Sequence, residues 1–521
     1  MSQSTAVSPP PTKLGAALAL TLVLLALALF VFSALLFSGY TCDDSYITFR
    51  YASNAAAGQG LVFNPGERVE GYSNPLWVFL LVGALKLGLE VVVAAKVLGV
   101  LAGMGALLFA FGIVRRLLGQ ADGWQPLVIL ALIGPGLAYY SVSGLETSLY
   151  CCLLTAAVYC LLLSSVAAQW ALSALVLAVA LTRPEGLLLA PALLGWRLVC
   201  WRQFEGRQKT ALVASTVLSL SGLAAFFLWR HSYFGAWLPN TFYAKPPGVF
   251  GGDSLLYPLG YLREFLATTG AWVWLAPGLA WLRRKPLAGG ALLVTLLVEV
   301  ALVFHAHGDW MVLSRFLLPV LPLLTAFGYA ALLHWKAPRS LLLSLLGLAL
   351  ALNAVQIAEQ LRDFREGQYP QSVMAGLRQQ VAGEWLRQHF PPTTVIAAKR
   401  IGGLSYYSGM RMVDMLGLVD RPIAMIRHGS QTRGKGEQGL MAAEVFRRQP
   451  DVILLCVMKR WDHVPRNEPA PDLANNLRDV DNAIYAGLGK HGYRFLYRLP
   501  QGATGEFAVY ARAGVRPSPP L

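Results

Sequence analysis

The stretch CDDSYITFRYASNAAAGQGLVFNPGERVEGYSNPLW, residues 42–77, directly follows a long apolar segment and is itself unusually polar. It carries two adjacent acids, Asp43 and Asp44, together with glycines, prolines and several aromatic side chains. Gly and Pro at this density favour an ordered, turn-rich loop. The sequence therefore predicts a structured loop at the end of a membrane helix, and the rest of the chain predicts the side of the membrane on which it lies.

The composition is that of a membrane protein. The 521 residues are 55% hydrophobic and only 14% charged, whereas a soluble domain has about 25% charged residues. Apolar runs of membrane-spanning length recur from residue 14 to about residue 357. The net charge of +15 is expected mainly on inside loops, where Lys and Arg accumulate, so we expect no nucleic-acid partner.

The expected orientation follows from placing four clusters of Lys and Arg on the cytoplasmic side of the membrane. They lie at residues 115–116, 197–209, 283–285 and 334–339. About eleven crossings then leave the N-terminus inside and everything after residue 357 outside. The apolar segment 75–90 is too short for a span in this arrangement, so we expect a re-entrant or surface-lying helix there.

The expected domain organisation follows from where the apolar runs begin and end along the chain. It comprises a disordered cytoplasmic N-terminus (1–13), a transmembrane domain (14–358) with its first outer loop at 39–90, an extracytoplasmic α/β domain (359–512) and a disordered tail (513–521). In the α/β domain we expect a helix at 373–390, strands at 394–398, 451–458, 494–499 and 506–512, and either a strand and turn or a sugar-facing surface at 404–422.

Nearly all unusual polar motifs fall on the predicted outer face. Besides 42–77, they are residues 143–148, 182–186, 231–245 and 305–310. A channel or carrier would more often place ionisable residues along a path through the bilayer or at its midplane. Chemistry on one face favours an enzyme whose active site opens outward.

Asp43 and Asp44 are the candidate catalytic acids. In a generic loop they would be solvated or would cap a helix. If a short helix begins here, neighbouring side chains point about 100° apart, so only one acid faces a substrate and the other supports or caps it. A carboxylate at a partly dry site can act as a general base or as a metal ligand.

Charged side chains at other helix ends are the candidate anion and sugar ligands. Glu146, Arg183 and Glu185 stand at predicted helix ends, and the three either form ion pairs that fix these ends or leave Arg183 to bind a phosphate. Arg315 in an apolar helix needs an anionic partner, which is either Asp309 or a ligand. In 237–245, an amide, aromatic side chains and Lys245 indicate a phosphate or sugar contact, or an interfacial anchor.

No nucleotide-binding motif is present: the sequence has neither a P-loop nor a GxGxxG that follows a strand. The sequence therefore gives no indication of a nucleotide-linked substrate.

The order DDSYITFRYA, GLVFNPGERVEGYSNPLW, SGLETSLY, TRPEG, YFGAWLPNTFYAK, GDWMVLSRFLLPVLP and VDMLGLVD resembles a bacterial family of polyprenyl-phosphate-dependent glycosyltransferases. These have the membrane-embedded glycosyltransferase C fold, and the resemblance is to arabinofuranosyltransferases of mycobacterial cell-wall type. It covers nearly the whole chain, and the first-loop block is its most specific part.

The resemblance implies transfer of a sugar, with arabinofuranose expected, from a polyprenyl-phosphate donor to a hydroxyl of a glycan or protein acceptor. The enzyme would be a multi-pass protein of the bacterial inner membrane that works on the periplasmic face. Asp43 and Asp44 would be catalytic, and would hold a divalent metal if one is needed. Candidate donor-phosphate ligands are Arg183, Lys245, Arg315 and Arg50. Candidate substrate-binding residues are Tyr46, Glu146, Glu185, Asn240, Tyr243, His307, Asp309 and Trp310.

Two other functions remain open at this stage. A transporter or flippase for a lipid-linked sugar would move the ligand across the bilayer without forming a glycosidic bond. A non-catalytic scaffold would leave the outer cluster of acids and bases unexplained.

Overall fold

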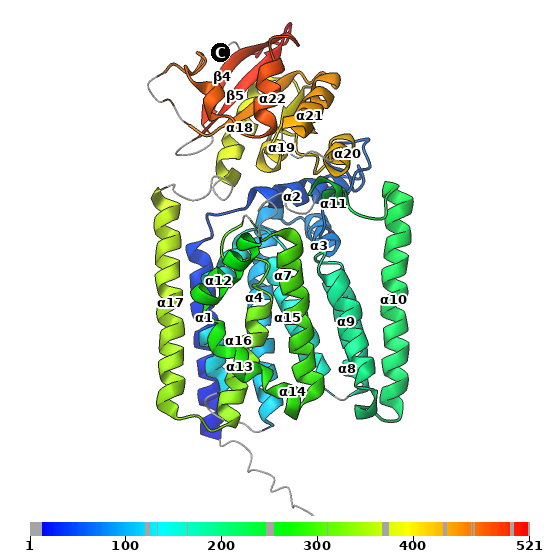
Figure 1. Ribbon diagram of the computed structural model, residues 1–521, viewed down its shortest axis with the longest axis vertical. Helices are drawn as coiled ribbons and strands as arrows, with labels where there is room; N and C mark the ends of the chain where they lie inside the picture. Colours follow the sequence, from blue (N-terminus) through cyan, green and yellow to red (C-terminus); the bar gives the residue numbers. More distant parts are fainter. Residues whose placement is uncertain are drawn as a thin grey trace, which may run out of the picture.

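The computed structural model describes residues 13–119, 125–132, 134–163, 165–245, 255–309, 311–366, 375–430, 435–459, 461, 464–500 and 505–518. A bundle of long helices carries a smaller domain, built around a sheet, at one of its ends (Figure 1). Three helices lie between these two parts: α2 (Asp43–Ala56), α3 (Pro75–Lys86) and α11 (Asn240–Ala244).

The helices of the bundle form because the chain offers long apolar runs between polar turns. They are α1 (Lys13–Leu36), α4 (Val91–Leu118), η1 (Gln125–Leu127), α5 (Val128–Ala131), α6 (Pro135–Val142), α7 (Thr147–Leu161), α8 (Val166–Ala180), α9 (Gly186–Val199), η2 (Trp201–Gln203), α10 (Arg207–Phe234), α12 (Leu256–Thr269), α13 (Trp272–Leu279), α14 (Trp281–Arg284), α15 (Pro286–Ala306), α16 (Val320–His334) and α17 (Arg339–Glu366).

The chain is a multi-pass membrane protein, as expected. Among the described residues, five helices are long and apolar enough to cross a membrane, namely α1, α4, α10, α15 and α17. The number rises to seven if two bent pairs, α6 with α7 and α12 with α13–α14, each count as one span. The expected count of about eleven is not confirmed. Four further apolar helices, α3, α8, α9 and α16, have only 12 to 15 residues, or about 18–23 Å, against a hydrocarbon core of about 30 Å.

The polar segment that follows α1 contains the helices α2 and α3. The two acids stand in the first turn of α2, where negative charge is favourable, and Pro75 occupies the start of α3, a position that suits its fixed φ. The turn around Gly144 holds both helices: the Trp77 indole donates to the Gly144 carbonyl at 2.9 Å. Gly144 has φ 84°, and a Cβ there would lie 2.9 Å from Ser45 of α2, so only glycine fits.

The C-terminal domain is an α/β sheet domain. Its elements are α18 (Ala375–His389), β1 (Val395–Ala398), α19 (Gly402–Ser408), β2 (Arg411–Asp414), α20 (Arg421–Gly429), α21 (Lys435–Arg447), β3 (Val452–Val457), η3 (Leu473–Asn476), α22 (Val480–Gly487), β4 (Tyr493–Pro500) and β5 (Glu506–Arg512). The strand order is β2-β1-β3-β5-β4, with β2, β1 and β3 parallel and β5 and β4 antiparallel. The four strands and the helix expected from the sequence are confirmed, and β2 lies in the segment 404–422.

Three buried aspartates of this domain hold their protons more tightly than usual. Burial raises the pKa of Asp414 and of Asp481 from 3.8 to about 6, and that of Asp420 to about 7. The folded domain therefore binds these protons more tightly than the unfolded chain does. The stability that these groups contribute is present below about pH 4 and is lost as the pH rises to about 7.

We therefore expect the midpoint of thermal unfolding of the C-terminal domain to fall by more than about 10 °C between pH 4.5 and pH 7.5. Calorimetry on the full-length protein in detergent measures this. The Asp414→Asn variant should show a smaller slope, because position 414 then no longer titrates. A midpoint that rises steadily through this window would contradict the prediction.

Candidate active site

A cavity of about 470 Å³ opens at the end of the bundle that faces the C-terminal domain. It lies between α2, the start of α3, the turn before α7, the N-terminal end of α9, α10, α11 and α15. Six of the residues singled out from the sequence line it: Asp44, Glu146, Arg183, Glu185, Lys245 and Arg315. Segments nearly 300 residues apart thus place acids and bases around one space.

The two adjacent acids point to different places. Asp44 lines the cavity, whereas the Asp43 carboxylate is buried and its Oδ1 accepts a hydrogen bond from the Gly403 amide at 2.7 Å. Burial and the neighbouring Asp44 raise the pKa of Asp43 to about 6. The separation of about 100° between consecutive helical side chains produces this division.

Arg183 is held by two carboxylates at the wall of the cavity. Its Nη1 lies 3.1 Å from Glu146 Oε1, and its Nε pairs with Glu185. All three side chains are at least nine-tenths buried. The Asn74 amide also donates to Glu146 Oε2 at 2.8 Å. The ion-pair interpretation of this motif is therefore the arrangement in the structure, and Arg183 adds no net positive charge to the wall.

Two further cations among the residues singled out from the sequence reach the cavity. The Arg315 Nε lies 2.8 Å from Asp309 Oδ2, and the Arg315 side chain is 14% exposed. Lys245 follows the last residue of α11 and is exposed. Within the described residues Lys245 has no carboxylate partner, so its ammonium group is the cation most available to an anionic ligand. His307 and Asp309 do not line the cavity, and Trp310 lies outside the described residues.

Parts of the sequence are similar to a protein family and to a known enzyme. A family model described as "Domain of unknown function (DUF8728)" matches residues 362–510. A terminal β-(1→2)-arabinofuranosyltransferase of Mycobacterium tuberculosis (strain ATCC 25618 / H37Rv) is 29% identical over 254 residues, which cover 45% of this chain and 39% of that protein. The match thus spans about two-fifths of the curated relative.

Solved structures share the overall fold of this chain. ArnT from Cupriavidus metallidurans, bound to undecaprenyl phosphate, has a TM-score of 0.57 at 14% identity, with 95% of this chain and 98% of that chain covered. The arabinofuranosyltransferase AftD from Mycobacteria has a TM-score of 0.54 at 16% identity, with 95% and 40% covered. An oligosaccharyltransferase from Archaeoglobus fulgidus has a TM-score of 0.51 at 10% identity, with 84% and 68% covered.

The chain has the glycosyltransferase C fold. The resemblance expected from the sequence is confirmed, both to this fold and to arabinofuranosyltransferases of the mycobacterial type. The expected class, a membrane glycosyltransferase, is supported by the same relatives.

Two candidate ligands of this glycosyltransferase C site contact the C-terminal domain instead of the cavity. Arg50 is buried, and its guanidinium donates to the carbonyls of Phe63, Ser405 and Met410 at 2.7–2.8 Å. Each of its three nitrogens already donates to a backbone carbonyl, and Arg50 does not line the cavity. The Tyr46 hydroxyl lies 3.1 Å from that of Tyr407.

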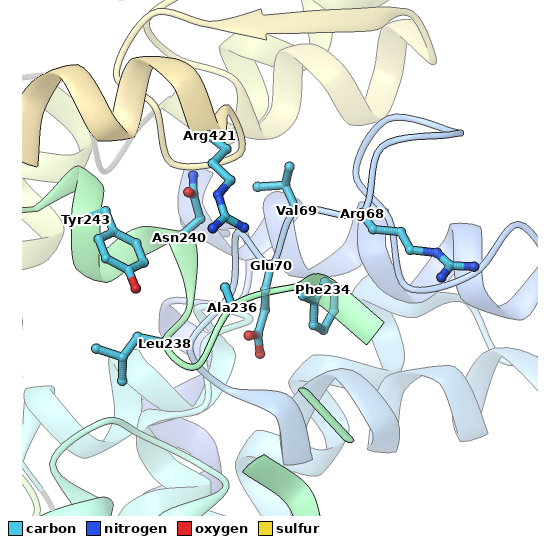
Figure 2. Close-up of a pocket in the computed structure, with 9 residues that line it drawn as sticks. All are labelled: Arg68, Val69, Glu70, Phe234, Ala236, Leu238, Asn240, Tyr243 and Arg421. Atoms are coloured by element: carbon cyan, nitrogen blue, oxygen red, sulfur yellow. The ribbon is translucent and has the colours of Figure 1, made fainter. Parts of the chain in front are cut away.

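Asn240 and Tyr243 of α11 line a second, much smaller pocket, which Figure 2 shows together with Arg421 of the C-terminal domain. Its volume of about 10 Å³ is enough for one water and too small for a sugar. The Asn240 amide donates to the carbonyls of Gly417 and Leu418. Asn240 therefore joins α11 to the C-terminal domain.

Sequence reasoning missed Arg230, which lines the large cavity near the end of α10. Its Nε lies 2.9 Å from Glu70 Oε2, and both side chains are buried. Burial raises the pKa of Glu70 to about 7, and the charge of Arg230 opposes this rise. The argument applied to Arg315, that a buried arginine in an apolar helix needs an anionic partner, would have found Arg230 as well. Asn74 and His305 also line the cavity, and both stand within motifs already quoted.

A metal at Asp43 and Asp44 stays a prediction. Within the part of the chain that the structure describes, no group of three or more His, Cys, Asp or Glu side chains converges as a metal site. Because Asp43 is directed to Gly403, the two acids do not present a joint pair of ligands to the cavity. The chemistry proposed below therefore uses only side chains of the chain itself.

Proposed function

We propose that the protein is a membrane glycosyltransferase that moves a sugar from a polyprenyl-phosphate donor to an acceptor hydroxyl. The observation that carries the proposal is the cavity, in which Asp44 shares one space with Lys245 and Arg315. A base and phosphate-binding cations are the groups that such a transfer needs. The names of the relatives support arabinofuranose as the sugar and a polyprenyl phosphate as its carrier.

In the proposed reaction Asp44 accepts the proton of the acceptor hydroxyl as its oxygen attacks the anomeric carbon of the sugar. The bond between that carbon and the phosphate oxygen breaks, and the oxygen keeps the electron pair. A glycosidic bond forms, and polyprenyl phosphate leaves with one more negative charge than it had in the donor. Preorganised positive groups at this oxygen lower the barrier.

Lys245 and Arg315 are the proposed phosphate ligands. Arg183 was a candidate too, but its charge is exceeded by those of Glu146 and Glu185. We assign Arg183 to holding these two carboxylates in the wall of the cavity, where they can accept hydrogen bonds from sugar hydroxyls. Arg315 retains a partly exposed guanidinium beside Asp309 and can donate from its outer face.

The apolar part of the cavity suits the polyprenyl chain. Leu188 of α9, Phe226 of α10 and Leu302 of α15 line it below the charged residues, and Leu188 is 60% exposed on the bundle surface. A lipid tail can pass this surface into the bilayer while its phosphate stays at the polar end. A soluble donor would not need such an outlet.

The proposed orientation places the cavity and the C-terminal domain on the periplasmic face of the bacterial inner membrane. The basic helix α14 lies at the opposite end of the bundle (Figure 1), where the positive-inside bias supports a cytoplasmic position. About eleven crossings between residues 14 and 358, the first outer loop at 39–90 and an extracytoplasmic domain at 359–512 remain part of this proposal. A glycan or a protein would supply the acceptor hydroxyl.

Transfer from purified donor tests the proposal. The protein in nanodiscs is mixed with decaprenyl-phosphoryl-[14C]arabinofuranose and a short arabinan, and labelled product is separated and identified by mass spectrometry. We expect an acceptor one pentose heavier and free decaprenyl phosphate. Movement of the donor between the leaflets of proteoliposomes without any glycosidic product would instead support a lipid-linked sugar flippase.

Lys245→Gln is expected to raise the donor KM about tenfold, because a phosphate loses one charge-assisted hydrogen bond. The side chain is exposed, so the thermal unfolding midpoint should stay within about 1 °C. Lys490→Gln, which removes an exposed lysine of the C-terminal domain, is the matched control and should leave the donor KM unchanged. Equal donor KM values for Lys245→Gln and the wild type would remove Lys245 from the phosphate site.

A further inference from the structure

Helix α2 has two faces with different partners. Asp44, Ile47 and Thr48 line the cavity. Asp43, Tyr46 and Arg50 instead contact the C-terminal domain, through the Gly403 amide, the Tyr407 hydroxyl and the carbonyls of Ser405 and Met410 respectively. At about 100° per residue these sets lie on separate faces of the helix. The rotation of α2 about its axis therefore decides where Asp44 points.

We propose that the C-terminal domain is a working part of the active site, because its helix α19 fixes the rotation of α2 and thereby directs Asp44 at the cavity. Asp43 and Arg50 are positioning residues in this arrangement, and neither contacts substrate. The inference rests on the proposed function, in which Asp44 is the base.

The contact at the start of α19 leaves no room for adjustment. A Cβ on Gly402 would lie 2.0 Å from the Asp43 carbonyl oxygen and 2.4 Å from its Oδ1, closer than non-bonded atoms approach. Glycine is therefore required for the backbone of α19 to reach α2. The Gly403 amide then donates to Asp43 at 2.7 Å. A displacement of about 1 Å in such a contact can cost about 100-fold in rate when it misplaces a reacting group.

Arg50, near the middle of α2, supplies a second contact with the C-terminal domain. One of its nitrogens donates to Phe63, which follows α2 in the polar loop, and two donate to Ser405, in the middle of α19, and Met410, just beyond it. Burial lowers the pKa of Arg50 to about 10, so it still carries its charge at neutral pH. Two buried contacts one and a half to two turns apart constrain rotation more than one would.

The C-terminal domain also forms part of the cavity itself. Leu418, which precedes α20, lines the cavity, and the Asn240 amide holds its carbonyl and that of Gly417. The C-terminal domain thus both orients Asp44 and lines part of the cavity that Asp44 faces.

Substitutions at Asp43 separate positioning from catalysis. Asn at position 43 retains an oxygen that accepts from the Gly403 amide, so Asp43→Asn should keep kcat within about threefold of the wild type. Asp43→Ala and Gly402→Ala should each lower kcat about 10- to 100-fold and leave the donor KM unchanged, because the phosphate ligands lie elsewhere. Asn should therefore replace Asp at position 43 with little loss of kcat, whereas Asn at position 44 should not support transfer.

The matched control is Glu67→Gln. It weakens an ion pair between Glu67 and Arg411 that also joins the polar loop to the C-terminal domain but is partly exposed. It should leave kcat, donor KM and the unfolding midpoint near the wild-type values. Each variant is measured as purified full-length protein, with its unfolding midpoint beside its kinetics.

Two outcomes would overturn the inference. Asp43→Asn as inactive as Asp44→Asn would make Asp43 a reacting group. Full kcat in both Asp43→Ala and Gly402→Ala would show that α19 does not direct Asp44. Failure of the proposed function looks different, since the wild-type protein itself would then form no glycosidic product. If Asp43→Ala does not fold, the comparison of Asp43→Asn with Asp44→Asn still decides, because both retain side-chain volume.

Discussion

Replacing Asp44 by Asn is expected to lower kcat for sugar transfer about 10²- to 10⁴-fold, the usual contribution of a general base. Asp44 is the acid of the pair that lines the cavity, and Asn has nearly its shape but cannot accept the proton of the acceptor hydroxyl. Donor binding should be retained, because Lys245 and Arg315 are unchanged. Single-turnover transfer of labelled pentose, with donor binding measured in parallel, checks both expectations.

Glu67→Gln serves as the control for removing one carboxylate from the same polar loop. Glu67 is partly exposed and does not line the cavity, so its loss should leave transfer near the wild-type rate. Asp44→Asn with more than about a tenth of the wild-type kcat would rule out Asp44 as the base. The unfolding midpoint of both variants should match that of the wild type, because neither removes a buried ion pair.

The sequence predicts which charged residues line the cavity better than it predicts the contacts of individual side chains. Arg315 was identifiable because a buried charge in an apolar segment is costly unless it has a function or a partner, and Asp44 and Lys245 because they stand in polar motifs next to predicted spanning helices. Arg50 has the same signature, yet its partners Ser405 and Met410 follow it by 355 and 360 residues. Local pattern carries no information about such a distant contact.

The helix count shows a similar limit. Hydropathy detects apolar runs but not bends, and α6 with α7 turns by 118° while α12 with α13–α14 turns by 93°. The turn between α6 and α7 contains Glu146, and the break between α8 and α9 contains Arg183. Polar residues of the proposed site thus stand at breaks between helices, and these breaks also make the spans hard to count.

Replacing Arg183 by Gln is expected to destabilise the protein by about 3–5 kcal/mol, the typical consequence of removing one partner from a buried ion pair. Glu146 and Glu185 would be left buried without their counter-charge. We expect a lower unfolding midpoint, a lower yield of folded protein in detergent and nearly complete loss of transfer. Differential scanning fluorimetry and the transfer assay measure these changes.

The triple variant Arg183→Gln, Glu146→Gln, Glu185→Gln separates structure from catalysis. With all three charges removed no buried charge is uncompensated, and neutral replacement of a buried ionic network is often tolerated. The unfolding midpoint should therefore recover most of its loss. Transfer should stay low, because the sugar hydroxyls lose charge-assisted hydrogen bonds to two carboxylates and meet only neutral amide oxygens. If Arg183→Gln alone were as stable as the wild type and only raised the donor KM, Arg183 would bind the donor phosphate instead of holding the two glutamates.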